Sequence, residues 1–235
     1  MQPRTTSRAA LFASLLVAAG VSPVAATEHD PGLWAIFSST DKIQANGEAT
    51  RWRYWFDAQA RFIDLGSNTN QYLLRPGVGY DLNDKLTVWA GYARFRVRNS
   101  AGDHADEDRF WQQATWTAAR WQSGTLSMRL RLEERSVSTG DDLGLVLRFM
   151  TNYTRPLGQS GKRDFVAAIE PFFALRETDW GGSSGLRQNR LAVGVAWKLS
   201  DKTTVETGYM NLFAWADSGE DRMQHLAVIN LKKKF

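Results

Sequence analysis

The side chains best suited to chemistry in this sequence are arginines that recur at alternate positions between residues 125 and 137. Arg129, Arg131 and Arg135 share one face of this run with Glu133, while leucine and methionine take most of the intervening positions. Guanidinium groups bind carboxylates and phosphates through paired hydrogen bonds. Arginine also outnumbers lysine 21 to 8 in the whole chain. The pattern predicts a basic face that can bind anions.

Segments with a period of two supply the elements that must carry such a face. Residues 51–63 place Trp52 and Tyr54 on one side and Arg53 and Asp57 on the other, which is typical of a strand with one apolar and one charged face. A shorter and weaker candidate covers residues 33–43. The clear segments are 51–63, 71–81, 86–97, 109–121, 126–137, 143–153, 165–176, 187–199, 203–213 and 223–235.

The lengths of these segments and of their connections predict a barrel in a membrane. Strands of soluble sheets usually have about five or six residues, whereas a tilted strand needs about 9 to 11 to cross a bilayer. Tight links such as 82–85 and 122–125 alternate with longer polar ones such as 98–108 and 178–186, which is the layout of bacterial outer-membrane barrels. An unpaired strand edge in hydrocarbon would leave backbone amides without partners, so the sheet must close.

We therefore expect an all-β, transmembrane, antiparallel up-and-down barrel of 10 to 12 strands over residues 27–235. Outer-membrane barrels of a single bacterial chain have even strand numbers, and residues 33–43 make the count uncertain. Two arrangements are open for this segment. It either lies inside or below a ten-stranded barrel, or it belongs to a barrel of twelve strands.

The inward face of this barrel is the candidate site, and two interpretations of it stay open. In the first it lines a narrow channel that favours small anionic solutes, because an unpaired buried arginine is costly unless water reaches it. In the second the charges pair with one another and plug a closed structural or envelope-maintenance barrel, because so narrow an interior is readily filled by side chains. The predicted lumen residues are Arg53, Asp57, Arg61, Arg75, Arg129, Arg131, Glu133, Arg135, Arg148, Glu170, Arg176, Arg190, Lys198 and Glu206.

Catalysis is the less expected alternative. General-base chemistry needs a histidine within hydrogen-bond reach of a second catalytic group, and no such spacing accompanies His29, His104 or His225. We assign no catalytic residue, no cofactor and no metal site, and the absence of cysteine excludes thiol chemistry. Acidic residues gather in the longer connections, where divalent cations bridging to lipopolysaccharide are conceivable, although solvated loops are the simpler interpretation.

The two ends of the chain indicate an exported protein. Arg4 and Arg8 precede a short apolar core at 10–21 and small residues at 24–26, the pattern of a signal peptide at 1–26 that is cleaved on export. The remaining 27 basic and 25 acidic residues indicate no nucleic-acid partner. The last segment ends on an aromatic residue, as in the sorting signals read by the barrel assembly machinery. Its lipid-facing residues are Ile229, Leu231 and Phe235.

Several stretches resemble one family in order along the chain. They are QYLLRPGVGYDLNDKLTVWAGY at 71–92, RFWQQ at 109–113, RLRLEER at 129–135, EPFF at 170–173 and QNRLAVGVAWKLSDKTTVETGYMN at 188–211. Together they resemble the bacterial outer-membrane proteins grouped as domain of unknown function 2490. The resemblance implies an outer-membrane β-barrel in contact with lipid and lipopolysaccharide, and it brings no established substrate or catalytic residue.

Overall fold

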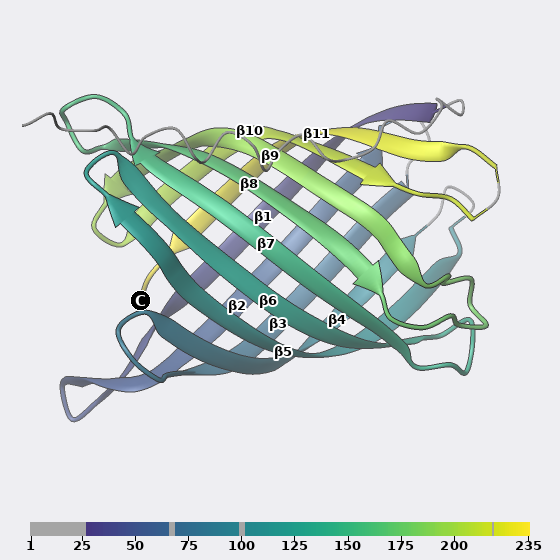
Figure 1. Ribbon diagram of the computed structural model, residues 1–235, viewed down its shortest axis with the longest axis horizontal. Helices are drawn as coiled ribbons and strands as arrows, with labels where there is room; N and C mark the ends of the chain where they lie inside the picture. The colour runs from purple at the N-terminus through teal and green to yellow at the C-terminus, as the bar shows by residue number, and fades with distance from the viewer. Residues whose placement is uncertain (1–26, 66–68, 99–101, 218) are drawn as a thin grey trace, which may run out of the picture.

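Eleven strands occupy the residues that the computed structural model describes, which are 27–65, 69–98, 102–217 and 219–235 (Figure 1). The signal peptide predicted at 1–26 lies outside them. The strands are β1 (Thr27–Ala45), β2 (Glu48–Asp64), β3 (Thr69–Asp81), β4 (Leu86–Arg98), β5 (His104–Trp121), β6 (Gly124–Val137), β7 (Gly144–Pro156), β8 (Arg163–Ala174), β9 (Gly185–Ser200), β10 (Thr203–Ala214) and β11 (Asp221–Lys233).

The strands form one closed barrel, which confirms the all-β class expected from the alternating segments. Consecutive strands pair antiparallel, and β1 closes the cylinder by pairing parallel with β11, for example through Ala35 and Ile229. The parallel pair departs from the antiparallel pattern, and the odd strand number explains it. Each hairpin reverses the chain, so the first and eleventh strands run in the same direction.

Residues 33–43 lie at the centre of β1, a full strand of the wall. They pair with β2 on one side and with β11 on the other, so they neither sit inside a ten-stranded barrel nor belong to a barrel of twelve strands in the described chain. Alternation is weak here because Trp34 and Ile36 are apolar and line the interior, while Leu33 is exposed on the outside.

The two ends of the cylinder differ in their connections. The end at which β11 finishes carries the shorter links, including the tight turn of Asn46 and Gly47, where both residues have positive φ as hairpin turns of this kind require. The other end carries most of the longer links and the first residues of β1, so the two termini of the described chain lie at opposite ends (Figure 1). The link at 157–162 is a longer one at the short-link end, as expected from the sequence.

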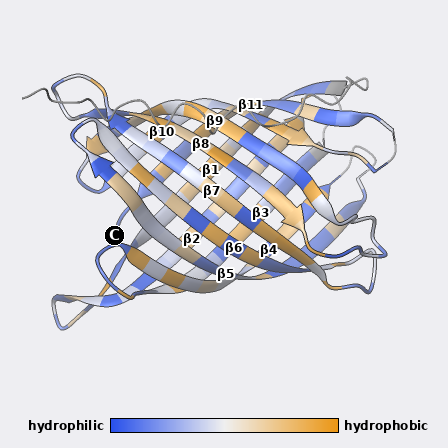
Figure 2. Ribbon diagram, viewed as in Figure 1, coloured by the Kyte–Doolittle hydropathy of each residue, from blue (hydrophilic) through white to orange (hydrophobic). Residues whose placement is uncertain are grey.

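The outer surface of the barrel is apolar and the interior is charged. Val78, Phe110, Leu130 and Leu191 are between 40 and 60% exposed, whereas several arginines are buried. Figure 2 shows hydrophilic and hydrophobic residues alternating along the strands. The described residues include no helix long and apolar enough to cross a membrane. Water would solvate such an outer surface poorly, and the acyl chains of a bilayer would match it.

Candidate functional site

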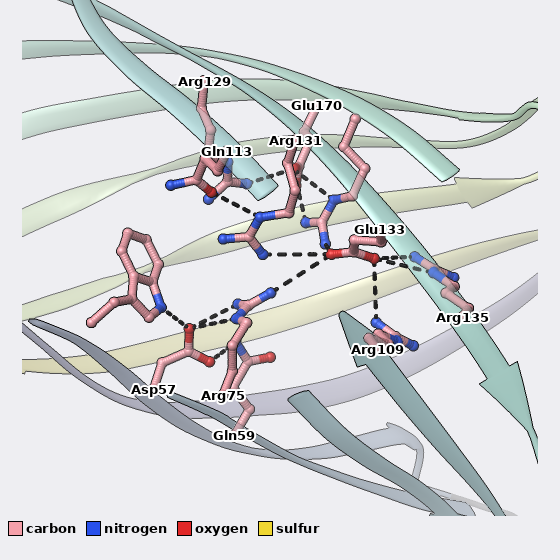
Figure 3. Close-up of polar contacts among 12 residues, drawn as sticks. Asp57, Gln59, Arg75, Arg109, Gln113, Arg129, Arg131, Glu133, Arg135 and Glu170 are labelled. Carbon is pink, nitrogen blue, oxygen red and sulfur yellow. Dashed lines mark hydrogen bonds and ion pairs between the residues drawn. The ribbon is translucent and has the colours of Figure 1, made fainter. Parts of the chain in front are cut away.

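The centre of the interior is a cluster of charged side chains built around Glu133 of β6 (Figure 3). Successive residues of a strand point to opposite faces, so Arg129, Arg131, Glu133 and Arg135 all enter the barrel. Glu133 is 1% exposed. Its carboxylate oxygens lie within 4.0 Å of five guanidinium groups, those of Arg75, Arg109, Arg131, Arg135 and Arg148.

The register of the sheet explains why this carboxylate is needed. Arg131 pairs across the ladder with Arg148, and Arg135 pairs with Arg109. Like charges directly opposite each other on neighbouring strands repel. Glu133 lies between both pairs, and it accepts hydrogen bonds from Arg148 at 2.5 Å and from Arg135 at 2.6 Å. One buried acid therefore holds four mutually repelling cations together.

A second carboxylate, Asp57 of β2, extends the cluster toward Arg75. The Nε and Nη2 atoms of Arg75 both lie 2.8 Å from Oδ2 of Asp57. Trp55 donates to the same oxygen at 2.8 Å, and Gln59 donates to Oδ1 at 2.9 Å. Both oxygens of Asp57 are thus satisfied by neighbours, and the residue is 2% exposed.

A third carboxylate, Glu170 of β8, is shared by three arginines. Arg129 lies 2.5 Å and Arg148 2.8 Å from its Oε1 atom, while Arg190 of β9 lies 3.8 Å from Oε2. Arg190 also lies over the rings of Trp34 and Phe172, at 4.9 and 4.4 Å from their centroids. The π face of an aromatic ring attracts a cation. These rings therefore stabilise the guanidinium group of Arg190, which shares the carboxylate of Glu170 with two other arginines.

Large aromatic side chains pack beside the cluster on β2, β4 and β5. Trp111 is 1% exposed and lies with Trp89 in a buried group against which Trp55 packs. Glycines provide the space, because a Cβ atom at Gly77 would lie 2.5 Å from the indole of Trp111 and one at Gly79 would lie 2.4 Å from that of Trp89. Each indole therefore packs against the backbone of β3 at a glycine.

Positive charge exceeds negative charge in this interior. Arg61 makes no ion pair among the described residues, and instead its guanidinium donates to Gln59 and lies 4.0 Å from the ring centroid of Trp34. The described interior cluster contains eight arginines and four carboxylates, namely Arg61, Arg75, Arg109, Arg129, Arg131, Arg135, Arg148 and Arg190 with Asp57, Glu107, Glu133 and Glu170.

A cavity of about 1000 Å³ adjoins the cluster on the side of the short connections. Its deep end reaches Arg129, Arg190 and Glu170, and its outer end reaches residues 160–162 and 199–202 in the links between strands. The interior is thus packed with side chains at the level of Arg131 and Glu133 and hollow between that level and one rim.

The structure does not gather all of the predicted lumen residues in one place. Arg53 pairs with Asp81, and Lys198 and Glu206 line the cavity, where Glu206 pairs with Lys232. Arg176 is a correction, because β8 ends at Ala174 and leaves Arg176 exposed in the following connection. The other ten residues belong to the cluster around Glu133, Asp57 and Glu170.

Sequence reasoning missed part of the cluster. Arg109 and Glu107 are paired at 2.7 Å in the interior, and Gln113 accepts a hydrogen bond from Arg131 at 2.8 Å. Glu107 falls within the longer polar connection predicted at 98–108, whereas β5 already begins at His104. The alternation of Glu107, Arg109, Trp111 and Gln113 was the signal available, since all four share one strand face.

Several acidic residues expected in solvated loops have protein partners. Asp106 pairs with Arg94 and Arg96, and Asp217 pairs with Arg187. Asp179 accepts hydrogen bonds from the backbone amides of Asp141 and Asp142, which hold the pKa of its carboxyl group below the usual value. The Asp106 contacts join β4 to β5, the Asp217 contact joins a connection to β9, and the Asp179 contacts join two connections at one rim of the barrel.

Two of the three histidines lie on the outer surface. His29 of β1 and His225 of β11 stack with ring centroids 5.2 Å apart, and Nδ1 of His29 lies 2.9 Å from Nε2 of His225. The hydroxyl group of Tyr209 lies 2.7 Å from the other ring nitrogen of His225. This arrangement joins the first and last strands across the closing seam.

The closed sheet, the apolar outer surface and the arginine-rich interior define a β-barrel protein of the kind that spans membranes. The chain belongs to the family described as "Protein of unknown function (DUF2490)", whose model matches residues 31–224. It is 32% identical to an uncharacterized protein of Methylorubrum extorquens strain AM1, over 94% of this chain and 95% of that protein.

Two solved structures have a similar general shape. The KdgM porin matches 74% of this chain and 80% of its own at 10% identity, with a TM-score of 0.45. The NanC porin matches 83% of this chain and 94% of its own at 11% identity, with a TM-score of 0.49. At these values neither similarity bears on function.

Proposed function

We propose that the protein is a closed, non-enzymatic β-barrel of the bacterial outer membrane, and that its arginine–carboxylate cluster plugs the lumen. The observation that carries this proposal is the burial of Arg131 and Glu133, which are 0% and 1% exposed at the centre of the barrel. A conducting lumen would bring water to these side chains. The barrel then serves the envelope as a structural element.

The energetics of the cluster support a structural role for the interior. Removing one partner of a buried ion pair leaves an uncompensated charge, which typically costs about 3 to 5 kcal/mol. Glu133 serves five arginines at once, so the cluster ties β3, β5, β6 and β7 together. A plug of this kind stabilises the barrel only while it stays intact.

Planar-bilayer recording tests the proposal directly. The reconstituted protein is expected to give no steady conductance, and Arg131→Ala is expected to lower the temperature of unfolding without making the membrane permeable. Arg94→Gln, on the outer surface, serves as the matched control. Steady conductance of the unaltered protein would contradict the closed barrel.

A narrow channel that favours anions is the second candidate. The excess of arginine over carboxylate in the interior supports it, because uncompensated guanidinium groups attract anions and repel cations. In this case the recording would show conductance with anion over cation selectivity, and neutralising Arg190 would reduce that selectivity. The two candidates therefore predict opposite results in the same experiment.

The proposed placement in the outer membrane assigns partners to the outer surface and the C-terminus. Lipid acyl chains would cover the apolar surface, lipopolysaccharide would meet the rim of longer connections, and the barrel assembly machinery would read the end of β11. Ile229, Leu231 and Phe235 are exposed, at 44, 41 and 73%, as a recognition signal requires. Replacing Phe235 by Ser is expected to reduce the amount of folded barrel in outer-membrane fractions.

A further inference from the structure

The cavity beside the short connections has a deep end with uncompensated positive charge. Arg129 and Arg190 share the carboxylate of Glu170 with Arg148, which also pairs with Glu133, and Nε of Arg129 has no hydrogen-bond partner in the described part of the chain. Arg190 and Arg129 retain 12 and 11% side-chain exposure, although Arg131 behind them is fully buried. A buried charge is costly without a counter-charge, so this end of the cavity is suited to an anion.

Apolar side chains contribute much of the cavity wall, beside polar ones such as Asn152, Asn230 and Glu206. The apolar ones include Ile36, Met150, Val166, Met210 and Val228. A free inorganic anion would gain nothing from these apolar side chains, whereas an apolar group of a ligand would be removed from water against them.

Lysines surround the opening of the cavity. Lys162, Lys202, Lys233 and Lys234 lie at its rim in the short connections and at the end of β11. Of the described residues that line the cavity, ten are lysine or arginine and four are aspartate or glutamate. An opening of one sign attracts ligands of the opposite sign and raises their association rate.

We propose that this cavity binds an amphiphilic organic anion that enters from the short-connection end. Its carboxylate or phosphate group meets Arg129 and Arg190, and its apolar body packs against Ile36, Met150 and Met210. The inference rests on the proposed outer-membrane placement only for its direction, since the short connections of such barrels face the periplasm. Binding itself depends on the cavity and not on whether the lumen conducts.

Calorimetric titration of the barrel in lipid nanodiscs tests this site. The probes are 2-naphthoate, 2-naphthyl phosphate, the uncharged 2-naphthalenemethanol and inorganic phosphate. The naphthoate or the naphthyl phosphate is expected to bind at one site per barrel, more tightly than both the alcohol and inorganic phosphate. Equal binding of the alcohol would overturn the role of the arginines, and equal binding of inorganic phosphate would overturn that of the apolar walls.

Two variants locate the site. Arg190→Gln is expected to weaken binding of the anionic probe by about tenfold or more, because it removes a charged hydrogen-bond donor. Ala192→Phe keeps every charge and fills the cavity, so it is expected to abolish binding in a barrel that still folds. Arg94→Gln, on the outer surface, should bind like the unaltered protein.

The outcomes separate this site from the closed barrel. A folded Ala192→Phe variant with unchanged affinity, or an unaltered protein that binds no anionic probe, would overturn the site while leaving a silent bilayer recording intact. A protein that binds naphthoate and also conducts would overturn the closed barrel and leave the site standing.

Discussion

Two walls of the barrel line the same interior, one with large side chains and the other with small ones. The wall of β4 and β5 presents Trp89, Phe95 and Trp111, all of them buried. The wall of β8 to β10 presents small residues to the cavity, including Ala168 and Ala192. Both walls adjoin the same arginine cluster, so the charge of the interior does not decide where it is hollow; side-chain volume does.

The two walls should differ in how well they accommodate larger side chains. Protein interiors are packed at crystal-like density, so added atoms are costly in one place and accommodated where space already exists. Substitutions on the two walls should therefore differ in their consequences for stability and for ligand binding.

The largest effect is expected from Glu133, on which the packed part of the interior depends. Glu133→Gln leaves five guanidinium groups without their shared charge and should lower the free energy of unfolding by about 3 to 5 kcal/mol. Urea unfolding followed by tryptophan fluorescence measures the loss. The matched control is Glu134→Gln on the outer face of β6, whose stability should stay within about 0.5 kcal/mol.

Adding one methyl group to Gly79 of β3, against the packed wall, should have the next largest effect. The new Cβ atom of Gly79→Ala would lie 2.4 Å from the indole of Trp89, and such overpacking typically costs about 1 to 3 kcal/mol. Trp89→Phe made in the same chain should recover part of this loss, and a thermodynamic double-mutant cycle measures the coupling. Strictly additive losses would show that the two residues do not compete for space.

Adding a larger group, a phenyl ring, on the other wall should be nearly neutral for folding. The ring of Ala192→Phe enters the cavity, so the free energy of unfolding should change by less than about 1 kcal/mol. A loss as large as that of the Gly79 variant would remove the distinction between the walls.

The smallest effect is expected from protonation of Asp179, which lies in a connection at the end of the barrel with the longer links. The pKa of Asp179 is lowered from 3.8 by the backbone amides of Asp141 and Asp142. The stabilisation is fully present above the unfolded-state value and is lost as pH falls through the lower folded-state value. The amide resonances of Asp141 and Asp142 should therefore shift below pH 3.8, and Asp179→Asn should abolish that transition.

The alternating pattern was sufficient to predict most of the wall, because period two is a direct consequence of strand geometry. The segment predicted at 86–97 is β4, which ends one residue later at Arg98. Residues 33–43 were ambiguous because apolar residues face both lipid and interior there. The parallel pairing of β1 with β11 follows from the odd number of strands. That number could not be predicted while the assignment of residues 33–43 was ambiguous.

The candidate site was predictable in its charge and not in its geometry. The inward orientation of Arg131, Glu133 and Arg148 follows from the alternation of side chains along each strand. That one carboxylate would serve five arginines depends on the register between strands, which this alternation does not specify. The cavity arises from small residues such as Ala168 and Ala192, and nothing in their type distinguishes a hollow interior from a filled one.

The odd number of strands has a topological result for anything attached to this protein. In a barrel with an even number of strands, both ends of the chain lie at the same end of the barrel. Here Thr27 and Phe235 lie at opposite ends. A label fused ahead of β1 and another fused after β11 would therefore be separated by the bilayer, and a membrane-impermeant reagent would reach one and miss the other.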